Sequence, residues 1–460
     1  MSERIIKSKR DFPAVEILVA DEKIMSVSSE LARPLVVDIV REVVERMKER
    51  LGRDCDEISF ENLRDTIIKQ IRIMRRKKIG RVINGTGILV HTNLGRAPLS
   101  EDLFDNIKNH ITGYGNLEFE VASGKRGRRG ELAEKYLALV SGVEAGTIVN
   151  NNAAALFIIL NTFANRRKVV ISRGELVQIG GGFRIPDIIR KSGAHLLEIG
   201  TTNITTLDDY RAALAEKPAM ILKVHRSNFA VTGFSAEIDL KALVQLGREF
   251  GLPVVNDLGS GVMVDTREFA GTEEPTVQGS VRDGAALTCF SGDKLLGGVQ
   301  AGLIVGYKDM VARIKKNPIY RVLRVDKTVF SAVEELLGYY LNNTWKEKIK
   351  LWRLAAISEA ELYQKGRCLL EEIGAGDKIS LDATRGRMGG GALPEVPLPS
   401  ISLIFNSTVK PQKIADLFRA AQPPVIGRIT DEKFMIDLKA IDDDDARWLV
   451  KIIQDLIDQL

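Results

Sequence analysis

Six short apolar stretches between residues 168 and 306 alternate with helical segments, and this alternation limits the possible folds more than any other feature of the chain. Apolar residues at helical spacing mark the intervening segments, for example 207–217 and 239–251. Strands separated by helices predict βαβ units and a parallel sheet, in which ligands bind at the carboxyl ends of the strands. We therefore predict an α/β domain over residues 76–325. The strand-like stretches are KVVISRG, HLLEIGT, AMILKVHRS, LPVVNDLGSG, ALTCFSGD and AGLIVG.

The regions on either side of this domain have a different pattern. Apolar residues at helical spacing predict helices at 34–51 and 59–78, the main elements of a helical domain over residues 1–75. The second helix ends in a cluster of lysines and arginines. Such cations are favoured at a helix C-terminus and are equally typical of a nucleic-acid contact, so both interpretations stay open. Residues 326–460 are predicted to form a small α+β domain. Within it we expect a strand at 402–405, a helix at 411–421 and a hairpin at 425–438.

Composition excludes several classes of protein. Hydrophobic residues make up 45% and charged residues 28% of the 460 residues, so the chain is neither disordered in bulk nor embedded in a membrane. No apolar run approaches the roughly 18 residues that a spanning helix needs, and the N-terminus lacks the pattern of a secretory signal. We therefore expect a cytoplasmic protein. Three scattered cysteines and four histidines argue against a disulfide framework and against a bound metal.

One lysine lies where a catalytic amine is expected. Lys294 follows the predicted strand ALTCFS, within SGDKLLGG, between small residues. Such a lysine is either an exposed turn residue or an unprotonated amine that forms a Schiff base with an aldehyde cofactor, provided that its surroundings lower its pKa. Pyridoxal 5'-phosphate is a cofactor of this kind, and the small residues leave room for its ring. We therefore expect Ser291 and Lys294 to contact this cofactor.

Two further motifs supply the partners that pyridoxal 5'-phosphate requires. Asn151, Asn152 and Ala153 lie between a predicted strand and a predicted helix, where free N–H groups and the helix dipole bind phosphate, although asparagine is also an ordinary helix cap. Asp257 ends an apolar strand, where it is either a turn residue or a carboxylate that needs a cation such as the protonated ring nitrogen. Phosphate loop, aspartate and lysine follow one another in the order of the aspartate-aminotransferase-like fold.

Longer motifs resemble one family of enzymes. They are VINGTGILVHTNLGRAPLS, VNNNAAALF, SRGELVQIGGGFRIPDIIRKSGAHLLEIGTTN, KVHRSNFAVTGF, NDLGSG, SGDKLLGG and PVIGRI. Together they resemble the bacterial selenocysteine synthases, the L-seryl-tRNA(Sec) selenium transferases, over nearly the whole chain. The resemblance implies a fold-type I transferase that depends on pyridoxal phosphate. Such an enzyme converts seryl-tRNA(Sec) to selenocysteinyl-tRNA(Sec) by β-elimination of water and addition of selenium from selenophosphate.

The resemblance also implies roles for particular residues and partners. Lys294 is implied to be the Schiff-base lysine, and Asp293 beside it is a candidate for tuning its charge or orienting the leaving hydroxyl. Arg96, Arg321 and Arg324 are implied to bind selenophosphate, a role that suits guanidinium groups and tetrahedral oxyanions. Without the resemblance, Arg321 and Arg324 would be interpreted as a basic helix face. The N-terminal helices are implied to contact tRNA, and the enzyme to be a homo-oligomer built from dimers, a decameric ring.

Three positions depart from the pattern of the family, and two alternatives stay open. Ile204 stands where a basic residue is common, Val299 where proline is usual, and Arg226 where a small hydroxylated residue is usual. The first alternative is a related lyase acting on a small amino acid or an amino-sugar phosphate, which would have no use for the N-terminal helices. The second is an RNA-binding scaffold without a cofactor, although an intact Lys294 argues against it.

Overall fold

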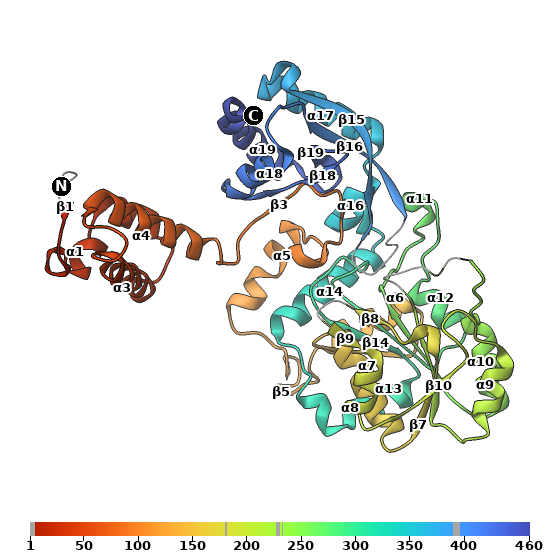
Figure 1. Ribbon diagram of the computed structural model, residues 1–460. Helices are drawn as coiled ribbons and strands as arrows, with labels where there is room; N and C mark the ends of the chain where they lie inside the picture. The colour runs from red at the N-terminus through yellow and green to blue at the C-terminus, as the bar shows by residue number, and fades with distance from the viewer. Residues whose placement is uncertain (1–4, 180–181, 227–230, 232, 390–395) are drawn as a thin grey trace. The chain divides into compact units, whose positions relative to one another are not determined.

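The computed structural model describes residues 5–179, 182–226, 231, 233–389 and 396–460. Within this part of the chain, seven strands form one mixed sheet in the order β10–β7–β11–β12–β13–β14–β6 (Figure 1). Neighbouring strands are parallel except that β14 is antiparallel to β13 and β6. Six strands therefore end at the same edge of the sheet, and the strands expected from the sequence are confirmed. Their bounds are β6 (Ala145–Val149), β7 (Lys168–Ser172), β10 (His195–Ile199), β11 (Met220–Val224), β12 (Val254–Gly259), β13 (Leu287–Ser291) and β14 (Gly302–Gly306).

Helices cover both faces of this sheet, which explains why its strands are apolar throughout. One face packs against α7 (Asn152–Ala164), α8 (Ile185–Lys191) and α13 (Lys308–Lys316). The helices on the other face are α6 (Glu131–Ser141), α9 (Leu207–Leu214), α10 (Leu240–Glu249) and α12 (Val277–Arg282). Successive residues of β12 point to opposite faces of the sheet. Val254 belongs to the hydrophobic cluster that includes residues of α9 and α10, and Val255 belongs to the cluster that includes residues of α7 and α8. Both side chains are buried.

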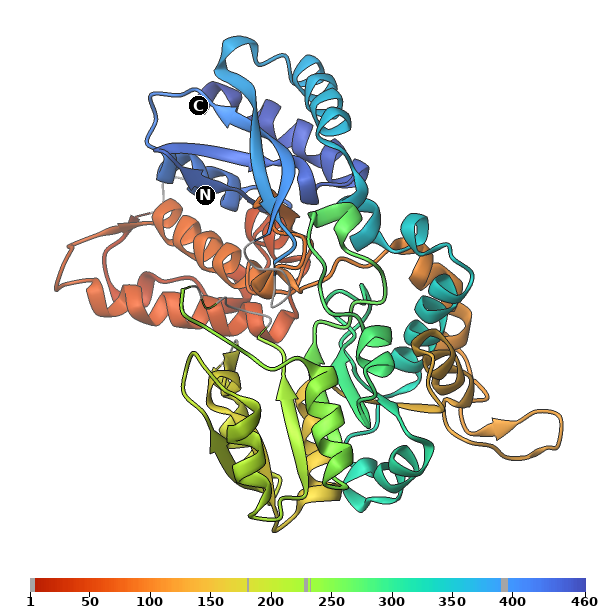
Figure 2. The same ribbon diagram turned by 90° about the vertical axis from the view of Figure 1, so that its right-hand side faces the viewer.

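Further elements surround this core. α5 (Glu101–Thr112) and α14 (Lys327–Leu341) pack on each other, and α14 also packs on α6. A hairpin of β4 (Phe119–Glu120) and β5 (Lys125–Arg126) extends away from them, visible in orange in Figure 2. The remaining short elements are β8 (Gln178–Ile179), β9 (Phe183–Arg184), α11 (Arg267–Ala270), α15 (Trp345–Lys348) and α16 (Lys350–Ala356).

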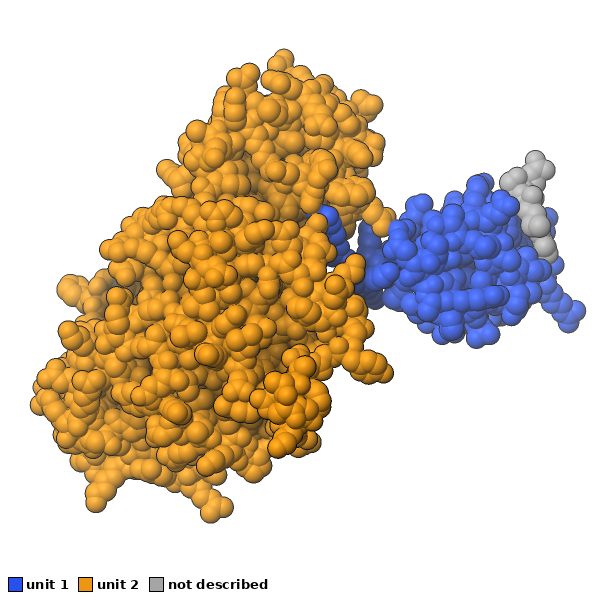
Figure 3. Space-filling model, turned by 180° about the vertical axis from the view of Figure 1, so that it is seen from behind, with its two compact units in different colours: residues 1–81 blue, residues 82–460 orange. Residues whose placement is uncertain are grey.

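The chain divides into two compact units, residues 1–81 and 82–460 (Figure 3). The first unit contains the two predicted helices as α3 (Arg33–Arg50) and α4 (Phe60–Arg75). Their apolar faces bury one cluster that includes Val40, Leu63 and Ile67. Among the described helices of both units, none combines the length and apolarity needed to cross a membrane. The other elements of this unit are β1 (Ile5–Ile6), α1 (Val15–Val19), α2 (Glu22–Ser28) and β2 (Ile58–Ser59).

The C-terminal region of the second unit contains a separate antiparallel sheet in the order β15–β16–β19–β18. Its core includes Leu403, Phe418 and Ile436, and Ile83, far away in sequence, belongs to the same cluster. The predicted hairpin is confirmed as β18 and β19, but β15 was not expected, because its exposed edge position leaves little hydrophobic alternation in the sequence. The division into three domains stays a prediction. The elements are β3 (Ile83–Asn84), α17 (Glu359–Ile373), β15 (Ile379–Arg387), β16 (Pro397–Phe405), α18 (Pro411–Ala420), β17 (Val425–Ile426), β18 (Arg428–Thr430), β19 (Lys433–Asp437) and α19 (Asp443–Leu456).

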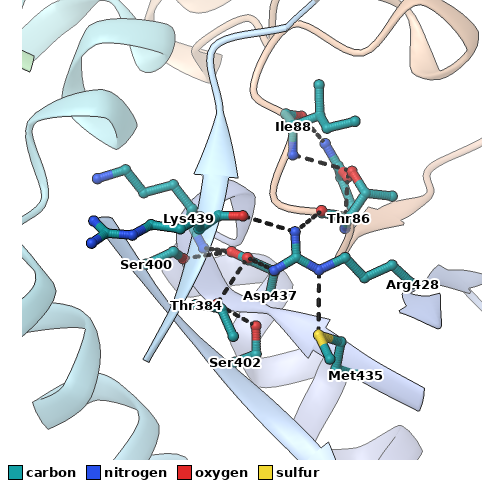
Figure 4. Close-up of polar contacts among 11 residues, drawn as sticks. Thr86, Ile88, Thr384, Ser400, Ser402, Arg428, Met435, Asp437 and Lys439 are labelled. Atoms are coloured by element: carbon teal, nitrogen blue, oxygen red, sulfur yellow. Dashed lines mark hydrogen bonds and ion pairs between the residues drawn. The ribbon is translucent and has the colours of Figure 1, made fainter. Parts of the chain in front are cut away.

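A buried carboxylate organises this C-terminal sheet (Figure 4). Asp437 has no exposed surface, and its carboxylate accepts hydrogen bonds from Ser400 Oγ at 2.6 Å and from the backbone N–H of Lys439 at 3.0 Å. Arg428 Nη2 donates to Asp437 at 3.0 Å, while Nη1 of the same guanidinium donates to the carbonyl oxygen of Arg385 at 2.9 Å. The ion pair therefore joins β15, β18 and β19.

The same carboxylate supports the segment that leads to Arg96. Gly87 has a φ of +78°, and a Cβ there would lie 2.5 Å from the carboxyl carbon of Asp437, so the backbone packs directly against the acid. Two backbone hydrogen bonds, Arg387 N–H to Gly87 O at 2.8 Å and Leu89 N–H to Arg387 O at 3.0 Å, continue the attachment to β15. The path of the chain before Arg96 is thus set by the C-terminal sheet.

Replacing Asp437 with asparagine is expected to destabilise the protein by about 3 kcal/mol, because it leaves the positive charge of Arg428 without its partner. We place the loss at the lower end for buried pairs because 28% of the Arg428 side chain is exposed. Urea unfolding followed by circular dichroism measures it. Asp416→Asn, which removes an exposed ion pair with Arg419, is the control and should cost less than about 1 kcal/mol. Equal stabilities of the two variants would contradict the structural role of Asp437.

Candidate active site

The carboxyl edge of the large sheet carries the three consecutive asparagines, residues 150–152, which we call the asparagine loop. They follow β6, and Asn151 caps α7 through a hydrogen bond from the backbone N–H of Ala154 to its Oδ1 at 2.9 Å. A Cβ at Gly302 would lie 2.0 Å from the carbonyl oxygen of Asn151, so only glycine at this position lets β14 lie this close to the asparagine loop. The start of a helix offers backbone N–H groups to an anion, so the phosphate site at Asn151, Asn152 and Ala153 stays a prediction.

Asp257 lies on β12 at the same edge, and the structure brings it together with this loop. Asn152 Nδ2 donates to Asp257 Oδ1 at 2.7 Å, and Asp257 is only 4% exposed. Burial raises the pKa of Asp257, while the hydrogen bond from Asn152, the charge of Lys294 and the thiol of Cys289 oppose that rise. A buried carboxylate of this kind is costly unless a cation lies against it. Asp257 is therefore a buried acid within β12 and not the turn residue of the alternative interpretation.

Lys294 follows β13 and is also buried, with 6% of its surface exposed. Burial is the largest cause that lowers its pKa, and the charge of Arg96 lowers it further. The carboxylates of Asp257 and Asp293 act in the opposite direction. The alternative of a solvated turn lysine is thereby excluded, and the amine gives up its proton more readily than an exposed lysine.

This titration can be measured directly. We expect the Lys294 amine of the cofactor-free protein to titrate with a midpoint below the ordinary lysine value of 10.5, because burial disfavours its charged form. NMR spectra of protein labelled with carbon-13 at the lysine Cε, recorded as the pH is raised, would show one lysine resonance whose titration midpoint lies below 10.5. That resonance should be missing from Lys294→Met. An early resonance that persists in the variant would contradict the assignment, as would a Lys294 midpoint at or above 10.5.

Arg96 contacts the residue beside the lysine. Its Nη1 donates to Asp293 Oδ2 at 2.6 Å, and the backbone N–H of Ala97 donates to the carbonyl oxygen of Asp293 at 3.1 Å. Arg96 has a φ of +68°, a conformation that costs a residue with a side chain about 1 kcal/mol or more. Asp293 is 6% exposed, and its second oxygen, Oδ1, has no hydrogen-bond partner. The strained arginine and the half-satisfied carboxylate are typical of a functional site.

The other two predicted arginines lie elsewhere on this edge. Arg321 ends a short 3-10 helix that begins at Pro318, and Arg324 follows three residues later. Both side chains are exposed, and neither forms an ion pair with a described residue. Their segment contacts the asparagine loop, because the backbone N–H of Asn150 donates to the carbonyl oxygen of Leu323 at 3.2 Å. Arg96 thus lies beside Asp293, and Arg321 and Arg324 lie beside the asparagine loop.

Two residues that the sequence did not single out, Cys289 and His225, contact Asp257, and a third, Glu274, contacts His225. Cys289 stands opposite Asp257 in the β12–β13 register and its thiol hydrogen-bonds the carboxylate. The backbone N–H of His225 donates to the carbonyl oxygen of Asp257 at 2.9 Å, and His225 Nε2 lies 3.0 Å from Oε1 of the buried Glu274. The position of His225 directly after β11 was a signal that could have identified it, since β11 ends at the same edge.

The three departures from the family pattern lie outside the contacts of Lys294 and Asp257. Arg226 donates to Glu237 at 2.7 Å, and Ile204 is 40% exposed. Val299 packs against the hydrophobic cluster that contains Leu295. None of these side chains contacts the lysine, the aspartate or the asparagine loop through a hydrogen bond or ion pair that the described residues show.

The arrangement fits pyridoxal 5'-phosphate. A buried amine of lowered pKa can bind an aldehyde, Asp257 can hold a proton on a ring nitrogen, and the start of α7 can bind a phosphate. Some of the buried polar atoms without a partner belong to this region, namely Asn152 Oδ1, Asp293 Oδ1 and Ser260 Oγ. Ser291 is buried at the end of β13, with its backbone against Gly302. The described residues contain no group of three or more side chains suited to a metal ion.

The sequence has close relatives. The family profile described as SelA, L-seryl-tRNA selenium transferase, matches residues 82–442. The L-seryl-tRNA(Sec) selenium transferase of Aquifex aeolicus (strain VF5) is 42% identical over 429 residues, which cover 92% of this chain and 94% of the relative. The protein of the same name from Geotalea daltonii (strain DSM 22248 / JCM 15807 / FRC-32) is 39% identical over 458 residues, which cover 97% and 99%.

A solved structure confirms the fold class. The structure of D-glucosaminate-6-phosphate ammonia-lyase superposes with a TM-score of 0.59 and covers 84% of this chain and 98% of its own. At 19% identity this likeness concerns the fold alone. The predicted fold-type I architecture, a mainly parallel sheet flanked by helices, is therefore confirmed. Because the family profile covers most of its length, the chain belongs to the SelA family, the L-seryl-tRNA selenium transferases.

Proposed function

We propose that the protein converts seryl-tRNA(Sec) to selenocysteinyl-tRNA(Sec), with selenophosphate as the selenium donor. The observation that carries the proposal is the buried pair of Lys294 and Asp257 at one sheet edge, in a chain 42% identical to a relative named for this activity. An RNA-binding scaffold without a cofactor would have no use for a buried amine of lowered pKa. The enzyme is accordingly a selenotransferase.

The cofactor is pyridoxal 5'-phosphate, which withdraws electrons from the Cα of the seryl group and so makes loss of the Cα proton feasible. Lys294 Nζ, unprotonated at the moment of reaction, accepts this proton. Asp257 keeps a proton on the ring nitrogen of the cofactor. Asp293, hydrogen-bonded to Arg96 and next to Lys294 in the chain, orients the β-hydroxyl, which takes up the proton that Lys294 received and leaves as water. Asn151, Asn152 and Ala153 bind the phosphate through the start of α7, and Ser291 lines the space for the ring.

Arg96, Arg321 and Arg324 are proposed to bind selenophosphate. Planar guanidinium groups donate paired hydrogen bonds to tetrahedral oxyanions, and the exposed Arg321 and Arg324 form no close ion pair among the described residues, although the charge of Arg324 acts on Glu118. Arg96 lies beside Asp293 and therefore next to the reacting lysine. This placement supports delivery of selenium to the β-carbon after water has left.

The N-terminal unit, residues 1–81, is proposed to contact the tRNA. The basic end of α4 supports this role, because Arg72, Arg76 and Lys77 are exposed and make no ion pair that the described part of the chain shows. Clustered exposed cations bind phosphate groups of nucleic acids. Nearby Arg75 instead pairs with Glu30.

The assembly is proposed to be a homo-oligomer built from dimers, and the decameric ring and the cytoplasmic location stay predictions. Apolar side chains on and near the β4–β5 hairpin support association, since Tyr114, Phe119 and Val121 are more than half exposed. Light scattering of the purified protein measures the number of subunits.

The decisive experiment incubates the holoenzyme with seryl-tRNA(Sec) and selenophosphate and measures selenocysteinyl-tRNA(Sec) by mass spectrometry of the released amino acid. Product should require both substrates. A parallel reaction with D-glucosaminate 6-phosphate, scored for ammonia, tests the lyase alternative. Ammonia release without selenocysteinyl-tRNA would refute the proposed function.

A further inference from the structure

Building on the proposed function, we propose that Asn150 is a positioning residue that couples the cofactor's phosphate site to the selenium-donor site. It does so by holding residues 321–324, here called the arginine segment, against the asparagine loop. Asn150 itself need not touch either ligand. Its role is to set where Arg321 and Arg324 stand relative to the start of α7.

The contacts of Asn150 are concentrated on two adjacent carbonyl oxygens. Its backbone N–H donates to Leu323 O at 3.2 Å. The side-chain amide is assigned the orientation that satisfies both of its polar atoms, in which its nitrogen donates to Leu323 O at 2.8 Å and to Arg324 O at 3.0 Å. One residue of the asparagine loop thus supplies the donors for both carbonyl groups.

Other residues fix the two flanks of the arginine segment. Before it, Asn317 Nδ2 donates to Asn161 Oδ1 at 2.9 Å, and the Tyr320 hydroxyl lies 2.7 Å from Thr147 Oγ1. After it, Arg129 Nη2 donates to Val325 O at 2.7 Å. Val325 is buried, whereas Val322 within the segment is 75% exposed.

Between these fixed flanks, Leu323 packs against the core of the large domain, and Asn150 supplies the hydrogen bonds. Apart from its own turn hydrogen bonds to residues 319 and 320, its described hydrogen bonds to the rest of the chain come from Asn150. The arginine side chains themselves make no ion pair with a described residue, so they do not anchor the segment. The position of Arg324 is therefore set by its carbonyl oxygen, through Asn150.

The coupling follows from the neighbours of Asn150 in the chain. Asn151 caps α7 and Asn152 donates to Asp257, so the residues after Asn150 belong to the cofactor site. A phosphate bound at the start of α7 orders the asparagine loop, and Asn150 transmits that order to the arginine segment. Because coupling between two binding sites is reciprocal, a bound donor also favours the ordered loop.

Asn150 is itself exposed, so replacing it should leave the fold intact. For Asn150→Ala we expect the KM for selenophosphate to rise about 10-fold through loss of two side-chain hydrogen bonds. The kcat and the visible absorbance of the bound cofactor should change less than about two-fold. Asn150→Asp should raise the KM further, since a carboxylate would face two carbonyl oxygens. Asn106→Ala, which removes an exposed amide bonded to Glu335, is the matched control.

An equilibrium measurement separates this inference from the proposed function. Calorimetric titration with selenophosphate should show tighter binding to the cofactor-loaded protein than to the cofactor-free protein, with a difference that shrinks in Asn150→Ala. If this pattern holds but no selenocysteinyl-tRNA is made, the coupling stands and the proposed function fails. Equal binding by wild type and Asn150→Ala would overturn the coupling, as would absent binding by wild type. The coupling would also be overturned if Asn150→Ala lost the absorbance of the cofactor while its affinity for selenophosphate stayed unchanged.

Discussion

Lys294→Ala is expected to lower the rate of selenocysteinyl-tRNA formation by at least about 10³-fold, because the variant lacks both the amine that binds the cofactor and the base that accepts the Cα proton. The visible absorbance of the bound cofactor should be missing from the purified Lys294→Ala variant. Single-turnover reactions with seryl-tRNA(Sec) and selenophosphate measure the rate, and a spectrum of the same sample measures the bound cofactor. The effect should be almost entirely on chemistry, since Lys294 is only 6% exposed and offers little surface to the tRNA.

Two further variants make this result specific. Lys294→Arg keeps a positive charge but does not release its proton at accessible pH, so it should be as inactive as alanine. Lys316→Ala removes an exposed lysine at the end of α13 that makes no ion pair among the described residues, and its activity should match wild type. Activity of Lys294→Arg above a few per cent of wild type would contradict the role of Lys294 as the base.

Asp257→Asn is expected to reduce kcat by about 10²-fold or more. The amide has the shape of the carboxylate but no negative charge, so it cannot hold the proton on the ring nitrogen that the carboxylate stabilises. The free energy of unfolding of the cofactor-free protein should not fall, because burial disfavours the carboxylate charge and raises the pKa of Asp257. Steady-state kinetics and urea unfolding measure the two effects separately.

The control for Asp257 is Asp265→Asn, which changes an exposed carboxylate paired with Arg267. This variant should retain wild-type kcat. A kcat of Asp257→Asn within two-fold of wild type would show that the ring nitrogen does not rely on this residue. The buried carboxylate would then serve only to hold Asn152.

The fold by itself does not decide between a selenotransferase and a lyase. The structure of D-glucosaminate-6-phosphate ammonia-lyase shares the architecture at 19% identity, whereas the selenium transferases share about 40% of their residues with this chain. Function follows from the site and the relatives, because one fold supports many reactions. The N-terminal unit, which a lyase acting on a small substrate would not need, agrees with the larger substrate.

Much of this arrangement could be predicted from local patterns. Alternating strands and helices predicted the large sheet, and the ends of β6, β12 and β13 predicted where Asn151, Asp257 and Lys294 would meet. Parallel strands place their carboxyl ends together whatever the details of packing, so chain order was sufficient. The edge strand β15 escaped prediction because partial exposure removes the alternation on which the prediction depends.

Contacts between distant segments could not be predicted in the same way. Cys289 reaches Asp257 only because the register of β12 and β13 sets them opposite each other, and a shift of one residue would turn the thiol to the other face. The support of the segment before Arg96 depends on Asp437, about 340 residues away in sequence.

The sequence by itself determined the class of fold and the family, and it predicted Lys294, Asp257 and the asparagine loop as site residues, since these follow from local periodicity and from motifs that are continuous in the chain. Only the tertiary structure decided that Lys294 and Asp257 are buried, that Arg96 pairs with Asp293, and that the backbone of Asn150 bonds to Leu323. Burial sets the pKa of a charged group, and burial depends on packing between elements distant in sequence. The same amino acids on an exposed turn would carry no catalytic function.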